Sequence, residues 1–221
     1  MTIEIKWTGD LNSPDGEKLI DAFKQAYKMN HKLSDFVLNM RGMSGKKYRV
    51  LINTLIENTA DVRYLEIGSY KGSTACAAIY GNDAKLSCID TFIWSSSQEL
   101  KDNIALASTK NVDFKLFEQD FRTIDYSNIG KYNIYMYDGP HDERDQFDGI
   151  LIAQPALEDK FLLIVDDWNG SHVQNGTINA MKYLGLNVLA SVEIFSPNEP
   201  ITDEKSDWHF GYFIGYVEKS Q

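Results

Sequence analysis

The sequence predicts an α/β protein with a mostly parallel, doubly wound sheet that carries helices on both faces. From residue 62 onward, short apolar runs alternate with stretches of helical periodicity, which is typical of successive strand–helix units. The apolar runs show little alternation of polar and apolar residues, as expected of strands that are buried on both faces. The last two runs follow each other without a helix between them, which predicts an antiparallel hairpin at the C-terminus.

The first part of the chain, residues 1–58, is expected to form a helical preface to a core at residues 62–221. The two parts are predicted to make one domain that covers the whole chain, because no linker composition separates them. Apolar side chains at helical spacing predict one helix at residues 16–29 and another at residues 46–58. The glycines and serine of residues 40–45 predict a loop between these helices.

The core is expected to contain seven strands, of which the last two form the hairpin. Strands are predicted at residues 62–67, 85–90, 112–118, 133–138, 161–166, 187–195 and 208–217. Helices are predicted at residues 72–81, 97–107, 143–156 and 173–184. The hairpin strands are joined by residues 196–207, whose two prolines and four carboxylates predict a surface loop.

The charge and composition of the chain argue against two kinds of partner, nucleic acids and membranes. The formal net charge of −10 argues against a nucleic-acid partner, which usually requires a basic face. The basic residues Lys46, Lys47 and Arg49 are interpreted as a solvated helix face rather than a binding patch. No apolar run reaches the ~20 residues of a membrane span, and the N-terminus lacks a signal-peptide pattern, so we expect a cytoplasmic protein without a membrane partner.

The stretch of residues 62–74 is the most informative part of the chain. A short apolar strand ends in Glu66, and Gly68 and Gly72 bracket a tight turn before the next helix. Glycine permits close approach of the backbone to a ligand, and N–H groups at a helix start suit an anionic or strongly polar ligand. The spacing differs from that of a dinucleotide loop and from that of a phosphate loop.

Acidic residues follow the next two strands at the edge where open α/β sheets bind ligands. Asp90 ends the second strand, 24 positions after Glu66, and could accept hydrogen bonds from ribose hydroxyls. The alternative is an aspartate that caps the following helix. Asp120 could accept from an adenine amino group while Phe121 packs near the ring, and the alternative for Asp120 is an ordinary turn residue.

The fourth and fifth strands end in a possible cluster of carboxylates, comprising Asp138, Asp166 and Asp167. If these strands are neighbours, three negative charges meet and would repel unless a cation lies among them. Oxygen ligands of this kind favour Mg²⁺ or a similar divalent ion. The alternative is that some of these residues cap helices or face solvent. His141 follows Asp138 by three residues and is either a general base or a surface residue of the loop.

Taken together, these motifs resemble class I S-adenosylmethionine-dependent methyltransferases. The stretch from Glu66 to Gly72 is similar to the motif of the metal-dependent catechol and caffeoyl-CoA O-methyltransferases, over about residues 60–170. Asp138 and the Asp166–Asp167 pair stand where that group has its metal ligands. Asp167 replaces an asparagine of the catechol type, as in bacterial sugar and macrolide O-methyltransferases, and His141 replaces a catalytic lysine.

The resemblance implies a seven-stranded, Rossmann-like methyltransferase fold and O-methylation of a small hydroxylated acceptor such as a sugar, polyketide or catechol. It is compatible with either a monomer or a homo-oligomer. It implies His141 as the catalytic residue and a divalent cation, Mg²⁺ or similar, at Asp138, Asp166 and Asp167. The residues implied to bind S-adenosylmethionine are Glu66, Gly68, Ser69, Tyr70, Gly72, Ser73, Asp90, Thr91, Asp120, Phe121 and Asp138.

Several alternatives remain open from the sequence. The same fold could carry a metal-independent methyltransferase or a related enzyme. It could also carry a non-catalytic protein that binds a nucleoside-type ligand, or an inactive member that acts as a partner subunit. An NAD oxidoreductase is disfavoured because Tyr70 stands where its fingerprint needs a second glycine. Three aromatic residues, Tyr70, Trp94 and Trp168, could line the pocket, although each could equally be an apolar anchor of the core.

Overall fold

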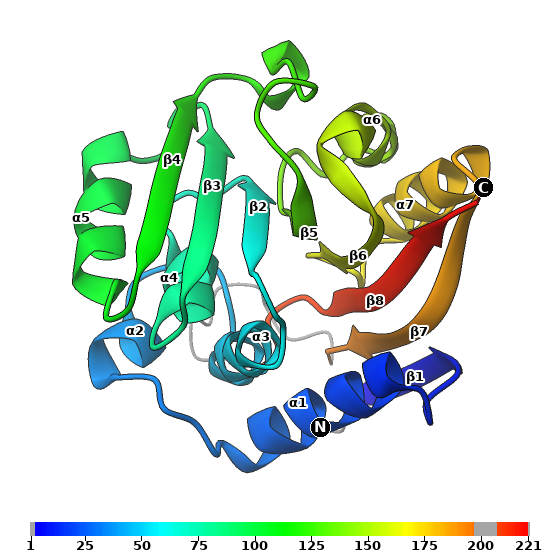
Figure 1. The fold of residues 1–221 in the computed structure, drawn as a ribbon, viewed down its shortest axis with the longest axis horizontal. Helices are drawn as coiled ribbons and strands as arrows, with labels where there is room; N and C mark the ends of the chain where they lie inside the picture. The colour runs from blue at the N-terminus through cyan, green and yellow to red at the C-terminus, as the bar shows by residue number, and fades with distance from the viewer. Residues whose placement is uncertain (1–2, 197–206, 221) are drawn as a thin grey trace.

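The computed structural model describes residues 3–196 and 207–220, and an eight-stranded sheet forms its middle layer (Figure 1). The strand order is β1-β7-β8-β6-β5-β2-β3-β4. Neighbours pair in parallel from β6 to β4, whereas β8 pairs antiparallel with both β6 and β7, and β1 pairs antiparallel with β7. The strands are β1 (Glu4–Gly9), β2 (Arg63–Ile67), β3 (Ala84–Asp90), β4 (Val112–Glu118), β5 (Tyr132–Tyr137), β6 (Leu157–Val165), β7 (Leu186–Phe195) and β8 (Tyr212–Lys219).

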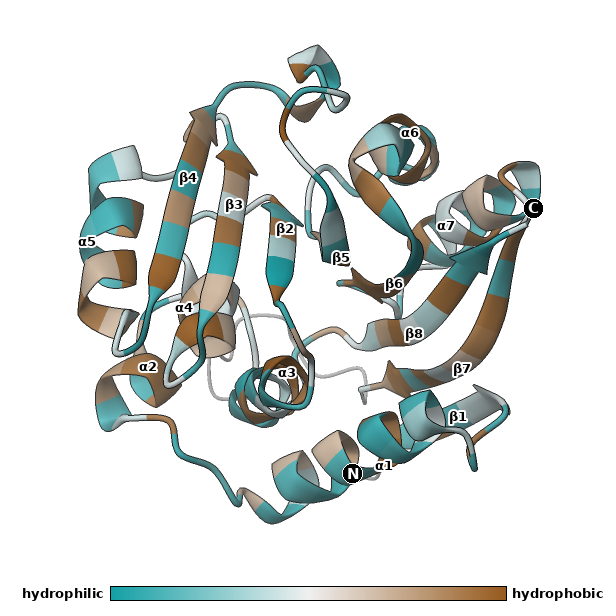
Figure 2. Cartoon of the chain, viewed as in Figure 1, coloured by the Kyte–Doolittle hydropathy of each residue, from teal (hydrophilic) through white to brown (hydrophobic). Residues whose placement is uncertain are grey.

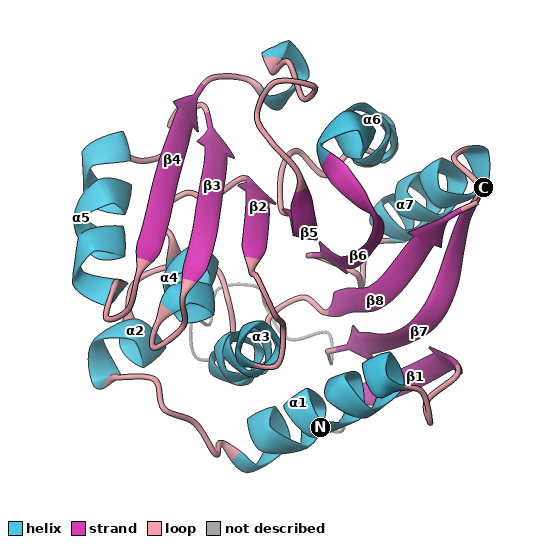
Figure 3. Cartoon of the chain, in the orientation of Figure 1, coloured by secondary structure: helices cyan, strands magenta, loops and turns pink. Residues whose placement is uncertain are grey.

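Helices cover both faces of this sheet, so the predicted doubly wound arrangement and the C-terminal hairpin are confirmed (Figure 3). They are α1 (Pro14–Lys28), α2 (Asp35–Asn39), α3 (Lys46–Glu57), α4 (Ser73–Ile79), α5 (Ser97–Ala107), α6 (Glu143–Ala153) and α7 (Ser171–Tyr183). Two short 3₁₀ helices, η1 (Phe121–Thr123) and η2 (Gln154–Ala156), complete the set in the described residues.

Two apolar clusters fill the spaces on either side of the sheet. The first joins the sheet to α1, α3, α4 and α5, and the second joins it to α6 and α7. Successive residues of one strand supply opposite clusters: Tyr64 belongs to the first and Leu65 to the second. Strands β3 and β4 show alternating hydrophobic and hydrophilic bands, and α1 and α5 also carry both kinds of residue, as expected of helices with one solvent-exposed side (Figure 2).

The N-terminal part differs from the predicted helical preface. Besides α1 and α3 it contains β1, which pairs with β7 from Glu4 opposite Phe195 to Gly9 opposite Ala190. The sheet therefore has eight strands rather than seven. The physical reason is a period of two: Ile5 and Trp7 pack against the first apolar cluster, while the residues between them face outward at the sheet edge. Most of the predicted loop at residues 196–207 lies outside the described residues.

Candidate active site

The glycine loop after β2 brings two strand ends into contact. Gly68 has a φ of +84°, and its N–H donates to Ile89 O at 2.9 Å. A Cβ atom at Gly68 would lie 1.8 Å from the backbone oxygen of Asp138. Only glycine allows the loop from β2 to pass this close to the loop from β5. Gly72 also has a φ of +84° and stands directly before α4.

Asp90 ties the glycine loop to the next connection. Its Oδ2 accepts the N–H of Tyr70 at 2.7 Å, and its Oδ1 accepts the N–H of Phe92 at 2.6 Å. These two bonds fix the orientation of the carboxylate. Each oxygen keeps a second acceptor position, so Asp90 can still accept two hydroxyl donors of a ligand.

A cavity of about 580 Å³ opens at the carboxyl ends of β2, β3, β4 and β5. It is here that the topology predicts ligand binding in an open α/β sheet. The predicted cofactor residues that line it after β2, β3 and β4 are Gly68, Tyr70, Asp90, Thr91, Asp120 and Phe121. Asp138 and His141 line the same cavity from the end of β5.

Other predicted cofactor residues lie behind the loop rather than in this cavity. Glu66 is fully buried, where its carboxylate accepts from the Tyr64 hydroxyl at 2.6 Å and the Thr74 hydroxyl at 3.0 Å. Burial raises the pKa of Glu66, although these hydrogen bonds oppose the shift. The Ser73 hydroxyl bonds to that of Ser44 at 2.9 Å. These hydrogen bonds stabilise the glycine loop on the side away from the cavity.

One more predicted residue of the loop, Ser69, is buried and does not line the cavity. Its hydroxyl lies close enough to Glu66 to oppose the rise in the pKa of that carboxyl group. Of the three aromatic candidates, Tyr70 and Trp94 line the cavity. Trp168 is 1% exposed, belongs to the second apolar cluster and donates its indole N–H to Glu193 at 2.8 Å, so its role is structural.

Asp138 and Asp166 meet where β5 and β6 end side by side, and their carboxyl groups hydrogen-bond to each other. Burial, followed by the charges of neighbouring carboxylates, raises the pKa of both groups well above the usual range. The Asp166 Oδ1 atom is buried and has no partner within the described part of the chain. The pair is therefore arranged to hold a proton or a cation between its oxygens.

Asp167 turns toward His141 instead of completing a three-carboxylate cluster. The Asp167 Oδ2 lies 3.2 Å from His141 Nε2, whereas Asp138 Oδ1 lies 4.0 Å away from the same nitrogen. His141 Nδ1 is buried and has no partner in residues 3–196 and 207–220. The carboxylate of Asp167 favours the tautomer with a proton on Nε2, which leaves the lone pair of Nδ1 available.

No group of three or more histidine, cysteine, aspartate or glutamate side chains in the described residues is arranged to hold a metal ion. The reason is that Asp138 and Asp166 face each other, whereas Asp167 faces the imidazole of His141. The oxygen chemistry of Asp138 and Asp166, with an orphaned Oδ1, still suits a hard divalent cation. A metal at this point stays a prediction.

Three further residues surround the carboxylates without any signal in the sequence. The stacked rings of Tyr48 and Tyr212, 3.5 Å apart, lie close enough to Asp166 for its charge to raise the pKa of both phenols after the larger effect of burial. His209, from the turn before β8, faces Asp167 and His141, and burial lowers its pKa. These side chains come from α3 and the C-terminal hairpin, so no local motif could reveal them.

Backbone strain concentrates at the same place. Among the described non-glycine residues, six have a left-handed φ, and four of these are Tyr70, Phe92, Asp167 and His209. Such conformations cost about 1–3 kcal/mol each and persist at functional sites where the surroundings enforce them. Their clustering supports the assignment of this edge as the active site.

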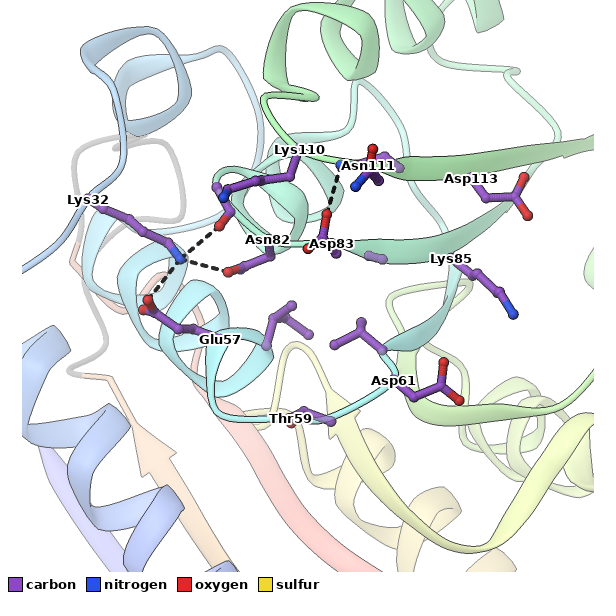
Figure 4. Close-up of a pocket in the computed structure, with 15 residues that line it drawn as sticks. Lys32, Glu57, Thr59, Asp61, Asn82, Asp83, Lys85, Lys110, Asn111 and Asp113 are labelled. Carbon is purple, nitrogen blue, oxygen red and sulfur yellow. Dashed lines mark hydrogen bonds and ion pairs between the residues drawn. The ribbon is translucent and has the colours of Figure 1, made fainter.

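A larger hollow of about 970 Å³ lies at the opposite edge of the sheet (Figure 4). It lies at the amino ends of β3 and β4, where parallel sheets do not usually build sites. Several of its polar groups are engaged with one another: Lys32 Nζ lies 3.1 Å from Glu57 and 2.6 Å from Asn82 Oδ1, and Asp83 accepts the Asn111 N–H at 2.9 Å. Size alone therefore does not identify the site.

Comparison of the chain with protein-family models and with curated proteins finds no match. Solved structures do match. TomG, an O-methyltransferase of Streptomyces achromogenes solved with its cofactor S-adenosylmethionine, gives a TM-score of 0.58 at 14% identity, covering 93% of this chain and 90% of TomG. A protein of Pyrococcus horikoshii proposed to be an RNA methyltransferase gives a TM-score of 0.53 at 14% identity. The match covers 95% of this chain and 99% of the Pyrococcus protein. TrmN of Thermus thermophilus gives 0.54 at 12% identity over 83% of this chain, which spans 52% of TrmN.

The chain therefore has the fold of the class I S-adenosylmethionine-dependent methyltransferases. Its neighbours in fold act on different acceptors by their own descriptions, so the fold does not choose between an oxygen of a small molecule and RNA. None of the described helices has the length and apolar character needed to cross a membrane.

Proposed function

We propose that this protein is an S-adenosylmethionine-dependent methyltransferase that methylates an oxygen of a small hydroxylated molecule. The observation that carries the proposal is Asp90, whose carboxylate is held by two backbone N–H groups at the wall of the carboxyl-edge cavity. This is the position from which a carboxylate can bind the two ribose hydroxyls of a nucleoside cofactor. The net charge of −10 favours a small acceptor over RNA.

The residues around Asp90 fit the rest of such a cofactor. Asp120 and Phe121, at the end of β4, offer an acceptor and a ring face for the purine. The glycine loop contributes Gly68 and Tyr70 to the cavity wall, where the backbone is proposed to approach the amino-acid part of the cofactor. When bound, the cofactor supplies an electrophilic methyl group, and the protein's task is to orient the acceptor oxygen in line with it.

His141 is proposed to take the proton of the acceptor hydroxyl. Asp167 holds the imidazole through Nε2, so Nδ1 is the nitrogen that accepts. Asp138 lies near this imidazole, bonds to Asp166 and lines the same cavity. This arrangement supports His141 as a proton acceptor next to the carboxylate pair, at the β5 end of the cavity.

A divalent cation is proposed to bind between the carboxyl groups of Asp138 and Asp166, with Asp167 as a third ligand if it turns from His141. Such an ion would neutralise the carboxylates and polarise the acceptor hydroxyl. The metal-independent methyltransferase remains the second candidate, because the carboxyl groups of Asp138 and Asp166 can hydrogen-bond to each other without an ion. A non-catalytic nucleoside-binding protein would use the Asp90 site alone.

Direct titration tests the cation. Mn²⁺ is expected to bind to the wild-type protein and to bind Asp166→Asn at least about 10-fold more weakly, because a charged ligand becomes a neutral amide. The matched control is Asp159→Asn, which changes an exposed carboxylate elsewhere on β6. Calorimetry measures both. Wild-type protein that takes up no Mn²⁺ would favour the metal-independent candidate.

Cofactor binding tests the proposed function itself. The probe is S-adenosylhomocysteine, and the measurement is isothermal titration calorimetry. Asp90→Ala is expected to lose about 1–3 kcal/mol of binding free energy, because the ribose hydroxyls lose a charged acceptor. The control Asp113→Ala removes an exposed carboxylate on β4 outside the cavity. Stronger binding of NAD than of S-adenosylhomocysteine would overturn the methyltransferase assignment.

A further inference from the structure

One face of β3 and β4 becomes polar toward the amino ends of these strands. The connection from β4 to β5, residues 119–131, is described in full and contains the short helix η1 but no α-helix (Figure 1). The helices α6 and α7 cover the same side of the sheet, but they pack on β5 and β7. Along β3 the face changes from Ile89, in the second apolar cluster, to Ser87 and then Lys85. A hollow of about 370 Å³ opens over this polar part.

Basic side chains gather around this opening, which we call the basic hollow. The strand register puts Arg63 of β2 and Asp113 of β4 on either side of Lys85, and Lys115 stands on the same face two residues beyond Asp113. Lys131 lines the hollow from the end of the connection before β5. Four lining residues are thus cations and one is a carboxylate, whereas the whole chain has a net charge of −10. The local charge is therefore opposite in sign to that of the protein.

Two of these cations have no partner in the described part of the chain. Neither Lys85 nor Lys115 makes a side-chain hydrogen bond or an ion pair with another described residue. Lys85 and Asp113 extend from neighbouring strands without an ion pair between them (Figure 4). Both lysines are exposed, so each keeps three N–H donors for solvent or for an anion.

Hydrogen bonds fix the floor of the basic hollow. The hydroxyls of Ser87 and Tyr132 lie 2.7 Å apart, and the Tyr132 hydroxyl donates to Ile129 O at 3.0 Å. Ser87 is 2% exposed and Tyr132 is 4% exposed. These bonds join β3 and the start of β5 to the connection that carries Lys131. The third lysine is therefore held beside the strands that present the other two.

The kind of cation indicates the kind of ligand. Arg63 is the single arginine among the lining residues, and two carboxylates already neutralise it: Nη1 lies 2.6 Å from Glu158 and Nε lies 3.2 Å from Asp61. The uncompensated charge comes from lysines, which bind phosphate as point charges. They approach from β3, β4 and the connection before β5. Convergence from three elements suits a group with several oxygens around one centre.

Single-stranded nucleic acid is a poorer match for this surface. Such ligands stack their bases on aromatic side chains along a basic groove. The one aromatic residue that lines the basic hollow, Tyr132, is buried in its floor and engaged by hydrogen bonds. The volume is instead at the lower end of the range of small-molecule sites, about 300–1,000 Å³.

We propose that the basic hollow binds the phosphate group of a small phosphorylated molecule through Lys85, Lys115 and Lys131. The site is separate from the carboxyl-edge cavity: Lys85 precedes Asp90 by five positions on β3, which corresponds to about 16 Å of strand. The inference therefore goes beyond the proposed function and does not rest on it. A ligand here can bind while the cofactor site is occupied or empty.

Calorimetry with inorganic pyrophosphate, in EDTA and without divalent cations, tests the site. The wild-type protein is expected to bind the probe, and the double variant Lys85→Gln/Lys115→Gln to bind it about 10-fold or more weakly, because two charges are lost. The matched control is Lys24→Gln/Lys182→Gln, which makes the same change in net charge at exposed lysines of α1 and α7 outside the hollow. Its affinity should stay within about 2-fold of wild type, since distant charges are screened.

Citrate at the same ionic strength tests the preference for phosphate. Its negative charge is divided among three separate planar carboxylates, so it is expected to bind about 5-fold or more weakly than pyrophosphate. The double variant should keep the affinity of the wild-type protein for S-adenosylhomocysteine, because the substituted lysines lie outside the carboxyl-edge cavity. It should also unfold at the same denaturant concentration, because neither lysine has a partner to lose among the described residues.

Each other outcome has a definite meaning. Absence of pyrophosphate binding, or equal binding by the Lys85/Lys115 double variant, would overturn the site. Citrate that binds as tightly as pyrophosphate would overturn the phosphate assignment. Self-association of the wild-type protein that is lost in the double variant and unaffected by pyrophosphate would make the hollow an interface between copies of the chain instead. Binding of pyrophosphate without any binding of S-adenosylhomocysteine would overturn the proposed function and leave this site in place.

Discussion

Gly68→Ala is expected to abolish binding of S-adenosylhomocysteine and to lower the free energy of unfolding by more than about 2 kcal/mol. Two causes combine. The backbone has a φ of +84°, which a side chain disfavours, and the new Cβ would lie 1.8 Å from the Asp138 carbonyl oxygen. The loop must move away from the end of β5, which displaces Tyr70 and Asp90 from the cavity wall. Calorimetry and chemical denaturation measure the two effects.

Gly130→Ala is the matched control for this substitution. Gly130 also has a positive φ, +109°, but no atom lies within 4 Å of the position that a Cβ would take there. The control variant therefore carries a backbone cost without the steric contact. We expect it to lose some stability and to bind S-adenosylhomocysteine as the wild-type protein does. Equal binding by the Gly68 variant would show that the close approach of the two loops is not needed for the cofactor site.

His141→Ala is expected to lower the rate of methyl transfer by about 10²-fold or more with little change in cofactor affinity. The substitution removes the Nδ1 lone pair that is proposed to take the acceptor's proton and leaves Asp90 and its contacts in place. The rate is measured as release of S-adenosylhomocysteine with whichever hydroxylated acceptor a screen identifies. Added imidazole should restore part of the rate, because a small base can enter the vacated space.

His172→Ala controls for the loss of a histidine as such. His172 is exposed on α7 and does not line the cavity, so its replacement should leave the rate unchanged. A His141 variant that turns over at nearly the wild-type rate would assign deprotonation to water. A variant whose cofactor affinity falls along with its rate would instead make His141 part of the binding wall.

The core of the fold could be predicted because its signals are local. Most strands from β2 to β6 are short, largely apolar runs, although β4 at the sheet edge alternates apolar and charged residues. The helices between them have their own periodicity, so the succession of strands and helices implies a parallel sheet covered on both faces. The strand at Glu4–Gly9 could not be predicted in this way, because its stability comes from pairing with β7, which lies far along the chain. An isolated six-residue alternation carries little information about such a partner.

Chain order alone indicates which residues reach the carboxyl edge, since a residue that follows a parallel strand must lie there. Asp90, Asp120, Asp138 and His141 line one cavity for that reason. The direction in which each side chain turns depends on the folded structure. Glu66 lies on the strand that leads into the glycine loop, but its side chain is buried on the same face of that strand as Tyr64, where Tyr64 and Thr74 hold it.

The same distinction separates the three carboxylates after β5 and β6. Their position at neighbouring strand ends follows from chain order, but their partners follow from packing: Asp138 with Asp166, and Asp167, in a left-handed backbone, with His141. Tyr212 and His209 reach this point from a hairpin that no local pattern connects to it. The order of residues therefore places the chemistry on one edge. Side-chain packing between distant segments selects which groups face each other, because those contacts depend on elements that meet only in the folded chain.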